Sequence, residues 1–378
     1  MRERTDSAVN AGRRPAAIVL VGLLGLAGLV YMIWPRSPAI EHTQASAAGS
    51  TWELRPDRAV LTGSTMGTTF SVVVAGADLN RAVLERLQLA IDAELERVND
   101  QMSTYRPDSE LSRFNAGPTS PAVPVSPELC AVVRDAKAVS AASGGAFDVT
   151  VGPLVDAWGF GPGSGAGLEQ RRELTDNQIA ILRDVVGDAK LSVDCEASTL
   201  GKSVAGLRVD LSAIAKGHGC DRVAAKLDEA GLRDYMVEIG GEVRVRGQNP
   251  EGEAWRVGVE RPTADAAGAR AVQAILRVRD VSVATSGDYR NYWERDGVRY
   301  SHTIDPRTGR PIQHRLASAT VIDARSAALA DAWATALNVL GPDEGLALAD
   351  DLGLAAYFLV RTDAGFEVRT SQAFAGYL

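Results

Sequence analysis

The segment 209–219 (VDLSAIAKGHG) constrains the fold of this chain more than any other. An apolar run ends at Asp210, the small residues Ser212 and Ala213 follow, and Lys216-Gly217 opens an amphipathic helical pattern. This order predicts a strand that turns directly into a helix. The amides and dipole at such a helix start, together with a lysine, can hold a phosphate. Asp210 can accept hydrogen bonds from a sugar or a base, so the segment predicts a nucleotide site.

The composition indicates a globular protein with an acidic surface. The chain has 378 residues, of which 46% are hydrophobic, enough for the core of one large domain or two ordinary ones. Its 48 acidic and 40 basic residues give a formal net charge of −8. Nucleic acid is therefore excluded as a partner, because its recognition requires a basic surface.

The cysteines allow two interpretations. Cys130, Cys195 and Cys220 lie far apart and match no metal-site spacing. One interpretation is three unpaired residues, with Cys130 buried in a helix. The other is a Cys195–Cys220 disulfide in an oxidising compartment.

The N-terminal sequence predicts a membrane anchor. Four arginines precede an uninterrupted apolar run over residues 16–34, which is long enough to cross a bilayer. Positive charge before the run predicts a cytoplasmic tail (1–15), a signal-anchor (16–34), a linker (35–57) and an exported domain (58–378). A cleaved signal peptide is the alternative, although its apolar core is normally shorter.

Helical and strand patterns alternate without a strict repeat, so we expect an α+β fold with mixed or antiparallel sheets and several long helices. Helical periodicity or caps predict helices over residues 79–102, 127–143, 175–186 and 326–340. Alternating or continuous apolar runs predict strands over residues 68–74, 235–239, 243–245, 255–259, 274–278, 281–284, 300–304, 318–323, 355–360 and 366–369. Residues 188–207 match no recognised segment and are interpreted as a variable excursion.

His302 is the first candidate for chemistry outside the opening segment. It lies in SHTIDPRTGRP (301–311), two residues before a turn that begins with Asp305-Pro306. A histidine in that position can act as a general base. The simpler alternative is a structural histidine hydrogen-bonded to the turn.

Asp331 and Thr335 form a second candidate pair. They are four residues apart in ADAWATAL (330–337), so on a helix they share one face. A carboxylate and a hydroxyl so placed can bind a hard cation such as Mg²⁺. The alternative is a hydrogen bond between the two side chains.

A third candidate is the segment Gly145-Ala146-Phe147-Asp148. It combines a glycine that permits close approach, an aromatic face and a hydrogen-bond acceptor, although it also fits a helix end followed by a strand. Met66 and Tyr105 are further groups beside turns that can line a flat ring or fill the core. Zinc-ligand spacing, a P-loop, a dinucleotide fingerprint and a nucleophile elbow are all missing from the sequence.

The order of these segments along the chain is more specific than any one of them. Taken together, they resemble the ApbE family, the FAD:protein FMN transferases, from about residue 61 to the C-terminus. The segments are Met66-Gly67-Thr68, MSTYRPDSELSRFN (102–115), GAFDVTVGPLVDAWGFGP (145–162), VDLSAIAKG, EIGGEV (238–243), TSGDYRNY (285–292), SHTIDPRTGRPI and ADAWATAL.

The resemblance implies a reaction and a set of partners. A member of this family binds FAD with Mg²⁺, cleaves the pyrophosphate, and transfers FMN to a Ser or Thr hydroxyl of a target protein while AMP leaves. The implied targets are exported flavin-carrying proteins, such as subunits of membrane redox pumps. The implied location is the inner (cytoplasmic) membrane, with the catalytic domain on the periplasmic side. An Mg²⁺-dependent FAD pyrophosphatase and a non-catalytic FAD-binding protein are the alternative functions.

The resemblance also assigns roles to individual positions. The catalytic base is His302. The metal ligands are Asp331, Thr335 and the backbone carbonyl of Ala213. The FAD contacts are Met66, Tyr105, Ala146, Phe147, Asp148, Asp210, Lys216 and the turn at Asp305. Ser212-Ala213 departs from the two glycines of many relatives, but these small side chains still leave the Ala213 carbonyl free to reach a metal.

Overall fold

The structure is a computed structural model that describes residues 42–45, 49–76, 79–162, 171, 173–262, 271–288, 291–295 and 297–377. The predicted tail and the predicted signal-anchor lie outside these residues. Within the described residues, no helix has the length and apolarity needed to span a membrane.

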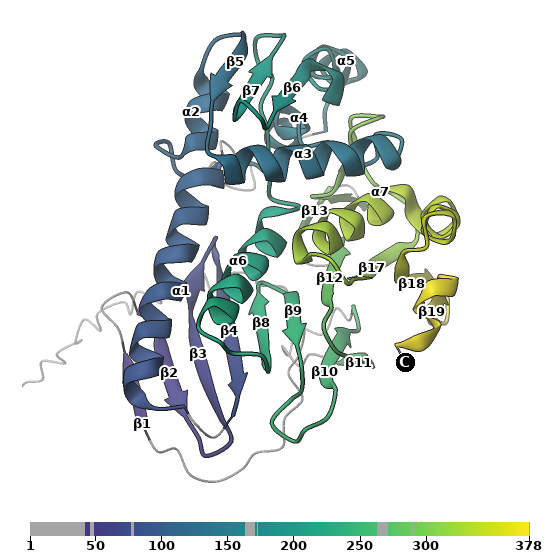
Figure 1. Cartoon of the computed structure of the whole chain (residues 1–378). Coiled ribbons are helices and arrows are strands. Elements are labelled where there is room, and N and C mark those ends of the chain that lie inside the picture. Colours follow the sequence, from purple (N-terminus) through teal and green to yellow (C-terminus); the bar gives the residue numbers. More distant parts are fainter. Residues whose placement is uncertain are drawn as a thin grey trace, which may run out of the picture.

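A ten-stranded sheet forms the centre of the molecule, and every neighbouring pair in it is antiparallel (Figure 1). In spatial order its strands are β1 (His42–Ala45), β2 (Thr51–Leu54), β3 (Arg58–Thr65), β4 (Thr68–Ala75), β8 (Tyr235–Ile239), β9 (Glu242–Arg246), β12 (Ser282–Gly287), β17 (Leu316–Asp323), β18 (Ala355–Thr362) and β19 (Gly365–Thr370). The α+β prediction with antiparallel strands is confirmed.

The sheet begins earlier in the chain than the sequence predicts. Strands β1 and β2 fall within residues 35–57, which were expected to be a linker. Trp52 pairs with Leu61 on β3 and is 4% exposed. Short strands rich in polar residues lack a strong alternating pattern, which explains why the linker prediction was wrong here.

Three helices cover one face of the sheet: α1 (Arg81–Met102), α6 (Ala215–Glu229) and α7 (Ala327–Leu352) (Figure 1). The apolar positions predicted for α1, from Leu84 to Val98, are buried as expected. Ser326, the first residue of the predicted helix, caps the start of α7, and the helix kinks at Gly341, one residue beyond the predicted end. Pro342 follows and cannot donate the next helical hydrogen bond, so the kink has a local cause.

The opposite face packs against a smaller sheet. Strands β10 (Trp255–Glu260) and β11 (Val272–Val278) pair antiparallel. Their buried side chains share a hydrophobic cluster with residues of β8, β9, β12 and β18. The C-terminal 3₁₀ helix η4 (Gln372–Gly376) adds Phe374 to this cluster. The sheet is therefore buried on both faces.

An additional layer lies beyond the ends of α1 and α6, at the top of Figure 1. It contains α2 (Glu110–Ala116), β5 (Ser120–Pro124), α3 (Pro127–Ala142), α4 (Gly152–Ala157), α5 (Asp176–Arg183), the 3₁₀ helix η3 (Asp188–Lys190), β6 (Leu191–Asp194) and β7 (Thr199–Lys202). The predicted cap Thr175 of α5 forms a complete capping box with Gln178. Residues 188–207, for which the sequence offered no structure, contain the β6–β7 hairpin.

The predicted strand over residues 300–304 is divided. It forms the end of β14 (Val298–Ser301), which pairs with β13 (Tyr292–Arg295), and the start of β15 (Ile304–Asp305), which pairs with β16 (Arg310–Pro311). His302 lies in the interruption between them. A residue outside a ladder is free to turn its side chain toward a site.

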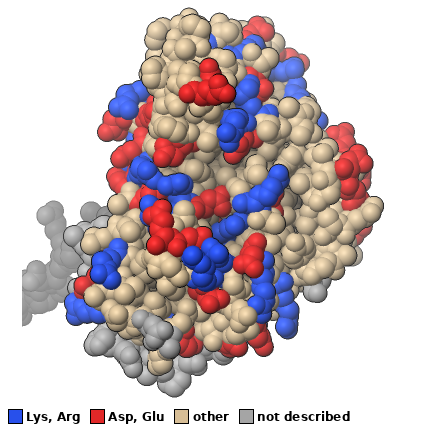
Figure 2. Space-filling view, in the orientation of Figure 1, with Lys and Arg blue, Asp and Glu red and all other residues tan. Residues whose placement is uncertain are grey.

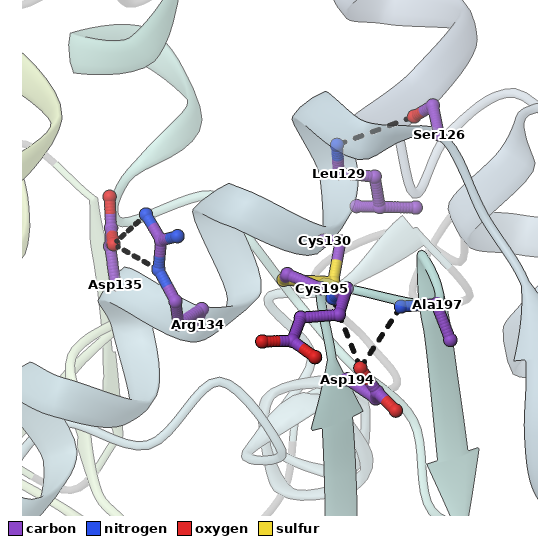
Figure 3. Close-up of a disulfide and its surroundings, with 9 residues drawn as sticks. Ser126, Leu129, Cys130, Arg134, Asp135, Asp194, Cys195 and Ala197 are labelled. Carbon is purple, nitrogen blue, oxygen red and sulfur yellow. Dashed lines mark hydrogen bonds and ion pairs between the residues drawn. A yellow bond between two sulfur atoms is a disulfide. The ribbon is translucent and has the colours of Figure 1, made fainter.

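The disulfide differs from both interpretations of the sequence. Cys130 of α3 is bonded to Cys195 in the β6–β7 turn, and Cys220 is a buried free thiol (Figure 3). Asp194 stabilises this turn by accepting hydrogen bonds from the amides of Glu196 and Ala197. The pairing was not predictable because it depends on an excursion whose path the sequence does not reveal.

We expect the double variant Cys130→Ser, Cys195→Ser to lower the free energy of unfolding by about 2–4 kcal/mol, because the bond constrains a long loop in the unfolded chain. Chemical denaturation in oxidising buffer measures this change. As a control, a reductant should bring the wild type to the stability of the variant and leave the variant unaffected. Equal stability of the two proteins in oxidising buffer contradicts the assigned pairing.

Candidate functional site

A cavity of ≈ 390 Å³ brings together segments that lie far apart in the sequence. Its walls come from the loop after α3, the start of α6, the β8–β9 turn, β12, the His302 interruption and α7. The sequence-predicted residues that line it are Tyr105, Ala146, Phe147, Asp148, Asp210, Ala213, Lys216, His302, Asp331 and Thr335. The predicted site is therefore a single place in the structure.

The approach of α6 to α7 builds the floor of this cavity. A Cβ atom on Gly217 would lie 2.2 Å from the backbone oxygen of Ala327, so only glycine allows the two helices to come this close. The crossing places the Gly217 amide 3.2 Å from Oδ2 of Asp331, to which it donates a hydrogen bond. The glycine after Lys216 thus has a packing role that connects the opening segment to α7.

Asp221, one turn further along α6, holds the same pair of helices together at the start of α7. Its carboxylate accepts hydrogen bonds from the Ser326 hydroxyl at 2.7 Å and from the amides of Ala327 and Ala328 at 2.9 and 3.0 Å. These amides are at the start of α7 and have no partner within the helix. The cap sets the rotation of α7 and so directs Asp331 and Thr335 toward the cavity.

Two buried carboxylates and one half-buried lysine meet beside the start of α6. Nζ of Lys216 lies 3.2 Å from Oε1 of Glu242 and 3.6 Å from Oδ2 of Asp331. Burial raises the pKa of Glu242 to about 8 and also raises the pKa of Asp331, while Lys216 opposes both shifts. When both carboxylates are ionised, one ammonium group faces two negative charges, so a cation that binds beside them favours the ionised form of the cluster.

The groups around Asp331 fit a hard divalent cation. Asp331 is 4% exposed, and Oε2 of Glu242 is a buried oxygen that has no hydrogen-bond partner among the described residues. Asp331, Thr335 and Ala213 line the same cavity and offer carboxylate, hydroxyl and carbonyl oxygens, respectively. No group of three or more His, Cys, Asp and Glu side chains that could hold a metal occurs in the described part of the chain. Few acidic ligands supplemented by neutral oxygens and water suit Mg²⁺.

One ring nitrogen of His302 forms a hydrogen bond within the protein. Its Nδ1 lies 2.9 Å from the backbone oxygen of Asn291, and its amide donates to that same oxygen. A carbonyl oxygen only accepts, so we assign the proton to Nδ1, which leaves Nε2 as an acceptor. Burial lowers the pKa of His302, which keeps the ring neutral and able to take a proton. The ring of Phe160 packs edge-on against it at 6.3 Å between centroids.

The carboxylate of Asp148 is already satisfied by the protein. Oδ1 accepts from the amide and hydroxyl of Thr150, and Oδ2 accepts from the amide of Asp188 at 3.0 Å. Asp148 is 9% exposed and lines the cavity. Its side chain therefore holds the shape of the loop, and the backbone and the Phe147 ring are the groups left to contact a ligand.

Asp210 joins this loop to the opening segment. Its amide donates to the oxygen of Val149 at 2.7 Å, and its Oδ1 accepts from the amide and hydroxyl of Ser212. The predicted strand before Asp210 is wrong, because only an isolated bridge between Arg208 and Val151 forms there. The segment is extended but does not belong to a sheet, and the helix begins after it as predicted.

Tyr105 lies at the rim of the cavity and is 69% exposed. A large aromatic ring left in solvent at the edge of a cavity is suited to stacking on a flat ligand.

Two predicted residues are not among those that line the cavity. Met66 packs between two hydrophobic clusters, and its backbone adopts a left-handed φ of 50° in the β3–β4 turn. Asp305 forms a bidentate ion pair with Arg307 and lines a neighbouring cavity, whereas Ile304 and Pro306 line the site. At both positions the prediction identified the correct turn, but the structure does not bring the side chain to the cavity.

Other lining residues were not predicted. Glu242 is the most important of them, and its only sequence signal was a charged residue directly after Gly240-Gly241 at the start of a strand. Gly240 adopts φ +61°, and a Cβ there would lie 3.2 Å from Cδ of Lys216, so this turn is shaped around the lysine. Phe160, Thr285 and Asn291 line the cavity as well, and they lie in or beside segments that were quoted without a role.

Comparisons with known proteins match most of the chain to one family. The model of the ApbE family matches residues 66–358. The FAD:protein FMN transferase of Vibrio cholerae is 47% identical over 320 residues, which is 84% of this chain and 92% of that protein. The protein of the same name from Haemophilus influenzae is 44% identical over 83% of this chain and 90% of its own length.

Solved structures give the same result. The flavin transferase ApbE from Vibrio cholerae superimposes with a TM-score of 0.76 at 43% identity, covering 85% of this chain and 99% of that one. The apo form of the Pseudomonas stutzeri flavinyl transferase ApbE gives 0.75 at 41% identity, with 85% and 97% coverage.

Proposed function

The chain belongs to the ApbE family and is an FAD:protein FMN transferase; we propose that it moves FMN from FAD to a threonine or serine hydroxyl of an acceptor protein, with AMP as the leaving group and Mg²⁺ as the metal. The observation that carries this proposal is that His302 and Asp331 line one cavity. A base for a hydroxyl and a ligand for a pyrophosphate-binding cation are the two functions that this transfer requires.

The bond changes balance with the groups present. The acceptor oxygen forms a bond to the phosphorus of the FMN half, and the bond from that phosphorus to the bridging oxygen breaks. The bridging oxygen leaves with AMP, and the hydroxyl proton passes to Nε2 of His302. The carbonyl of Asn291 holds the imidazole in the tautomer that accepts this proton, and it also accepts a hydrogen bond from the imidazolium that forms.

Asp331, Thr335 and the carbonyl of Ala213 would hold the Mg²⁺ ion, which supplies charge neutralisation at the pyrophosphate oxygens when bound. The amide of Gly217 orients the Asp331 carboxylate. Lys216 balances the charge of Asp331 and Glu242, so its ammonium group acts mainly on these carboxylates and less as a free phosphate ligand.

The flavin nucleotide is held by the other walls. We assign ring stacking to Tyr105, backbone contacts to Ala146 and Phe147, and an acceptor role to Asp210, because all of them line the same cavity. These contacts would hold FAD in a fixed position relative to His302, which also lines the cavity.

We place the catalytic domain outside the cytoplasm, on the periplasmic side of the inner membrane, attached through residues 16–34. The arginines before that apolar run support this orientation, and the Cys130–Cys195 disulfide supports an oxidising compartment. The acceptor is then an exported protein, such as a subunit of a membrane redox pump. A tether at the membrane surface raises the local concentration of enzyme near such an acceptor.

The metal requirement is the direct test of this proposal. Purified enzyme is incubated with FAD and an acceptor protein, and flavin fluorescence on the acceptor is read after denaturing electrophoresis. We expect labelling with Mg²⁺, loss of labelling with a chelator, and recovery when Mg²⁺ is returned in excess. Undiminished labelling in the chelator would exclude the metal assignment.

A further inference from the structure

Hydrogen bonds connect the β6–β7 hairpin and η3, which precedes it, to both segments that form the nucleotide walls of the cavity. Asp188 of η3 contacts Asp148 directly, and Lys202 of the hairpin acts through Asn115 of α2, although no residue of the hairpin lines the cavity. The hairpin follows η3 and spans residues 191–202. It was interpreted from the sequence as a variable excursion, and the mechanism above does not use it.

The first connection runs from α3 to Asp148. Nζ of Lys137 donates to the oxygens of Asp188 and Leu191 at 2.7 and 2.8 Å and lies 2.8 Å from Oδ2 of Asp188. The amide of Asp188 donates to Oδ2 of Asp148, and the amide of Gly187 donates to the Thr150 hydroxyl at 2.7 Å. Lys137 therefore fixes η3, which leads into the hairpin. Asp188 of η3 in turn holds the loop that carries Ala146 to Asp148.

The second connection runs from the end of the hairpin to Asp210. Lys202 is 3% exposed, and its Nζ donates to the oxygens of Phe114 and Asn115 at 3.0 and 2.9 Å. The side chain of Asn115 then brackets Val209: its Nδ2 donates to the Val209 oxygen, and its Oδ1 accepts from the Val209 amide, both at 2.8 Å. Lys202 thus holds the segment that presents Asp210.

Lys202 is an unusual structural residue. A fully buried ammonium group is costly unless its hydrogen bonds are satisfied, and desolvation lowers the pKa of Lys202. Carbonyl oxygens at the end of α2 satisfy it, with the Phe114 ring 5.4 Å away. The buried ammonium group of Lys202 is tolerated because it hydrogen-bonds to these carbonyl oxygens, and the same bonds connect β7 to the end of α2.

The hairpin is itself attached to α3 at two points. Cys130 and Lys137 are two helical turns apart and share a face of α3. Cys130 is bonded to the tip of the hairpin (Figure 3), and Lys137 holds its base. These two attachments restrict the movement of the hairpin relative to α3.

We infer that η3 and the β6–β7 hairpin together position both nucleotide walls of the cavity, with Lys137 and Lys202 as positioning residues for FAD. This inference rests on the proposed function, because it takes the 146–148 loop and Asp210 as FAD contacts. It adds that the affinity for FAD depends on residues that do not touch FAD.

The test uses Lys137→Met and Lys202→Met in the full-length enzyme. Each variant removes donors to backbone oxygens while keeping an unbranched apolar stem. We expect the Kd and KM for FAD to rise roughly tenfold, the loss typical of one charge-assisted hydrogen bond. The kcat at saturating FAD should stay within about twofold, since His302 and Asp331 are held by other segments.

Arg134→Met is the matched control for Lys137→Met. Arg134 is on the same helix and carries the same charge, but it pairs with Asp135 on the exposed side (Figure 3). It should leave FAD affinity unchanged. Lys137→Arg, which keeps donors at the same place, should restore most of the affinity.

A double-variant comparison makes the outcome decisive. Lys137→Met and Asp148→Asn should affect FAD binding by less in combination than the sum of their separate effects, because Lys137 acts through the Asp148 loop. Unchanged FAD affinity in a folded Lys137→Met variant, or an equal loss in Arg134→Met, overturns the inference. If Lys202→Met does not fold, Lys137→Met decides alone. Failure of the wild type to label an acceptor refutes the proposed function instead.

Discussion

Asp331→Asn is expected to lower kcat/KM for flavin transfer by at least about 10³-fold. A bound metal supplies several kcal/mol of transition-state charge stabilisation, and each 1.36 kcal/mol corresponds to a factor of ten. Asparagine keeps the size of the side chain and an oxygen that can accept from the Gly217 amide, so the change isolates the loss of charge. Asp331→Ala removes the ligand entirely and should abolish metal-dependent turnover.

Asp331→Asn should not unfold the enzyme. Asp331 is a desolvated carboxylate that shares Lys216 with Glu242, and burial raises its pKa. In Asp331→Asn the Lys216–Glu242 pair remains and the Gly217 amide keeps an oxygen acceptor, so the substitution leaves neither a buried charge nor a buried amide without a partner. We therefore expect a Tm equal to or above that of the wild type, together with the loss of activity.

Asp343→Asn provides the control for this substitution. Asp343 is on the same helix, but its side chain is 89% exposed and pairs with Arg369 on the surface. Its replacement should leave transfer within about twofold of the wild type. Normal activity of Asp331→Asn at limiting Mg²⁺ would show that Asp331 is not a metal ligand.

His302→Ala is expected to slow transfer by about 10²–10⁴-fold, the usual contribution of a positioned general base. FAD affinity should change little, because the FAD contacts assigned here come from other segments. Burial lowers the pKa of His302, so the ring stays in its base form below the ordinary value of about 6.5. The acid limb of the wild-type kcat profile should accordingly lie below about pH 6.5 and disappear in the variant.

A binding measurement separates the two roles open to His302. Equilibrium FAD binding is compared with the single-turnover transfer rate in the same preparation. His314→Gln is the control, since His314 lines the neighbouring cavity and not the site. If FAD affinity falls in parallel with the rate in His302→Ala, then His302 is a binding residue and not the base.

The sequence predicted the elements that bury long apolar faces. Helix α1 follows its pattern closely because its apolar positions repeat with the helical period over 22 residues. Strand β8 was recognisable as a short, nearly continuous apolar run, and all five of its residues are buried. Features that depend on contacts between distant segments were not predicted. Strand β2 forms because Trp52 packs in the core, and the Cys130–Cys195 bond forms because the hairpin returns to α3.

The site was predicted to a similar extent and for similar reasons. The helical spacing of Asp331 and Thr335 predicted that they share one face, and both line the cavity. Their role as metal ligands came from the family resemblance and stays a prediction. Glu242 was not predicted. Its importance arises from the 3.2 Å distance between its Oε1 and Nζ of Lys216, which joins the first residue of β9 to the start of α6. The turn motif correctly predicted a turn at Asp305. It did not predict that the Asp305 carboxylate pairs with Arg307.

The opening segment illustrates how structure changes the interpretation of a motif. Lys216 suggested a phosphate ligand at a helix start. In the folded protein it sits between two buried carboxylates, and Gly217 supplies the close helix contact and the amide that binds Asp331. The motif therefore contributes to the surroundings of the proposed metal site as well as to the proposed nucleotide site.

The central claim is that a protein hydroxyl, and not water, receives the FMN group. The most direct measurement is the intact mass of an acceptor protein after incubation with enzyme, FAD and Mg²⁺, alongside chromatography of the released nucleotides. We predict an acceptor heavier by FMN minus water, AMP equal in amount to the labelled acceptor, and little free FMN. Free FMN and AMP in equal amounts, with an acceptor of unchanged mass, would contradict the account and identify the enzyme as a pyrophosphatase.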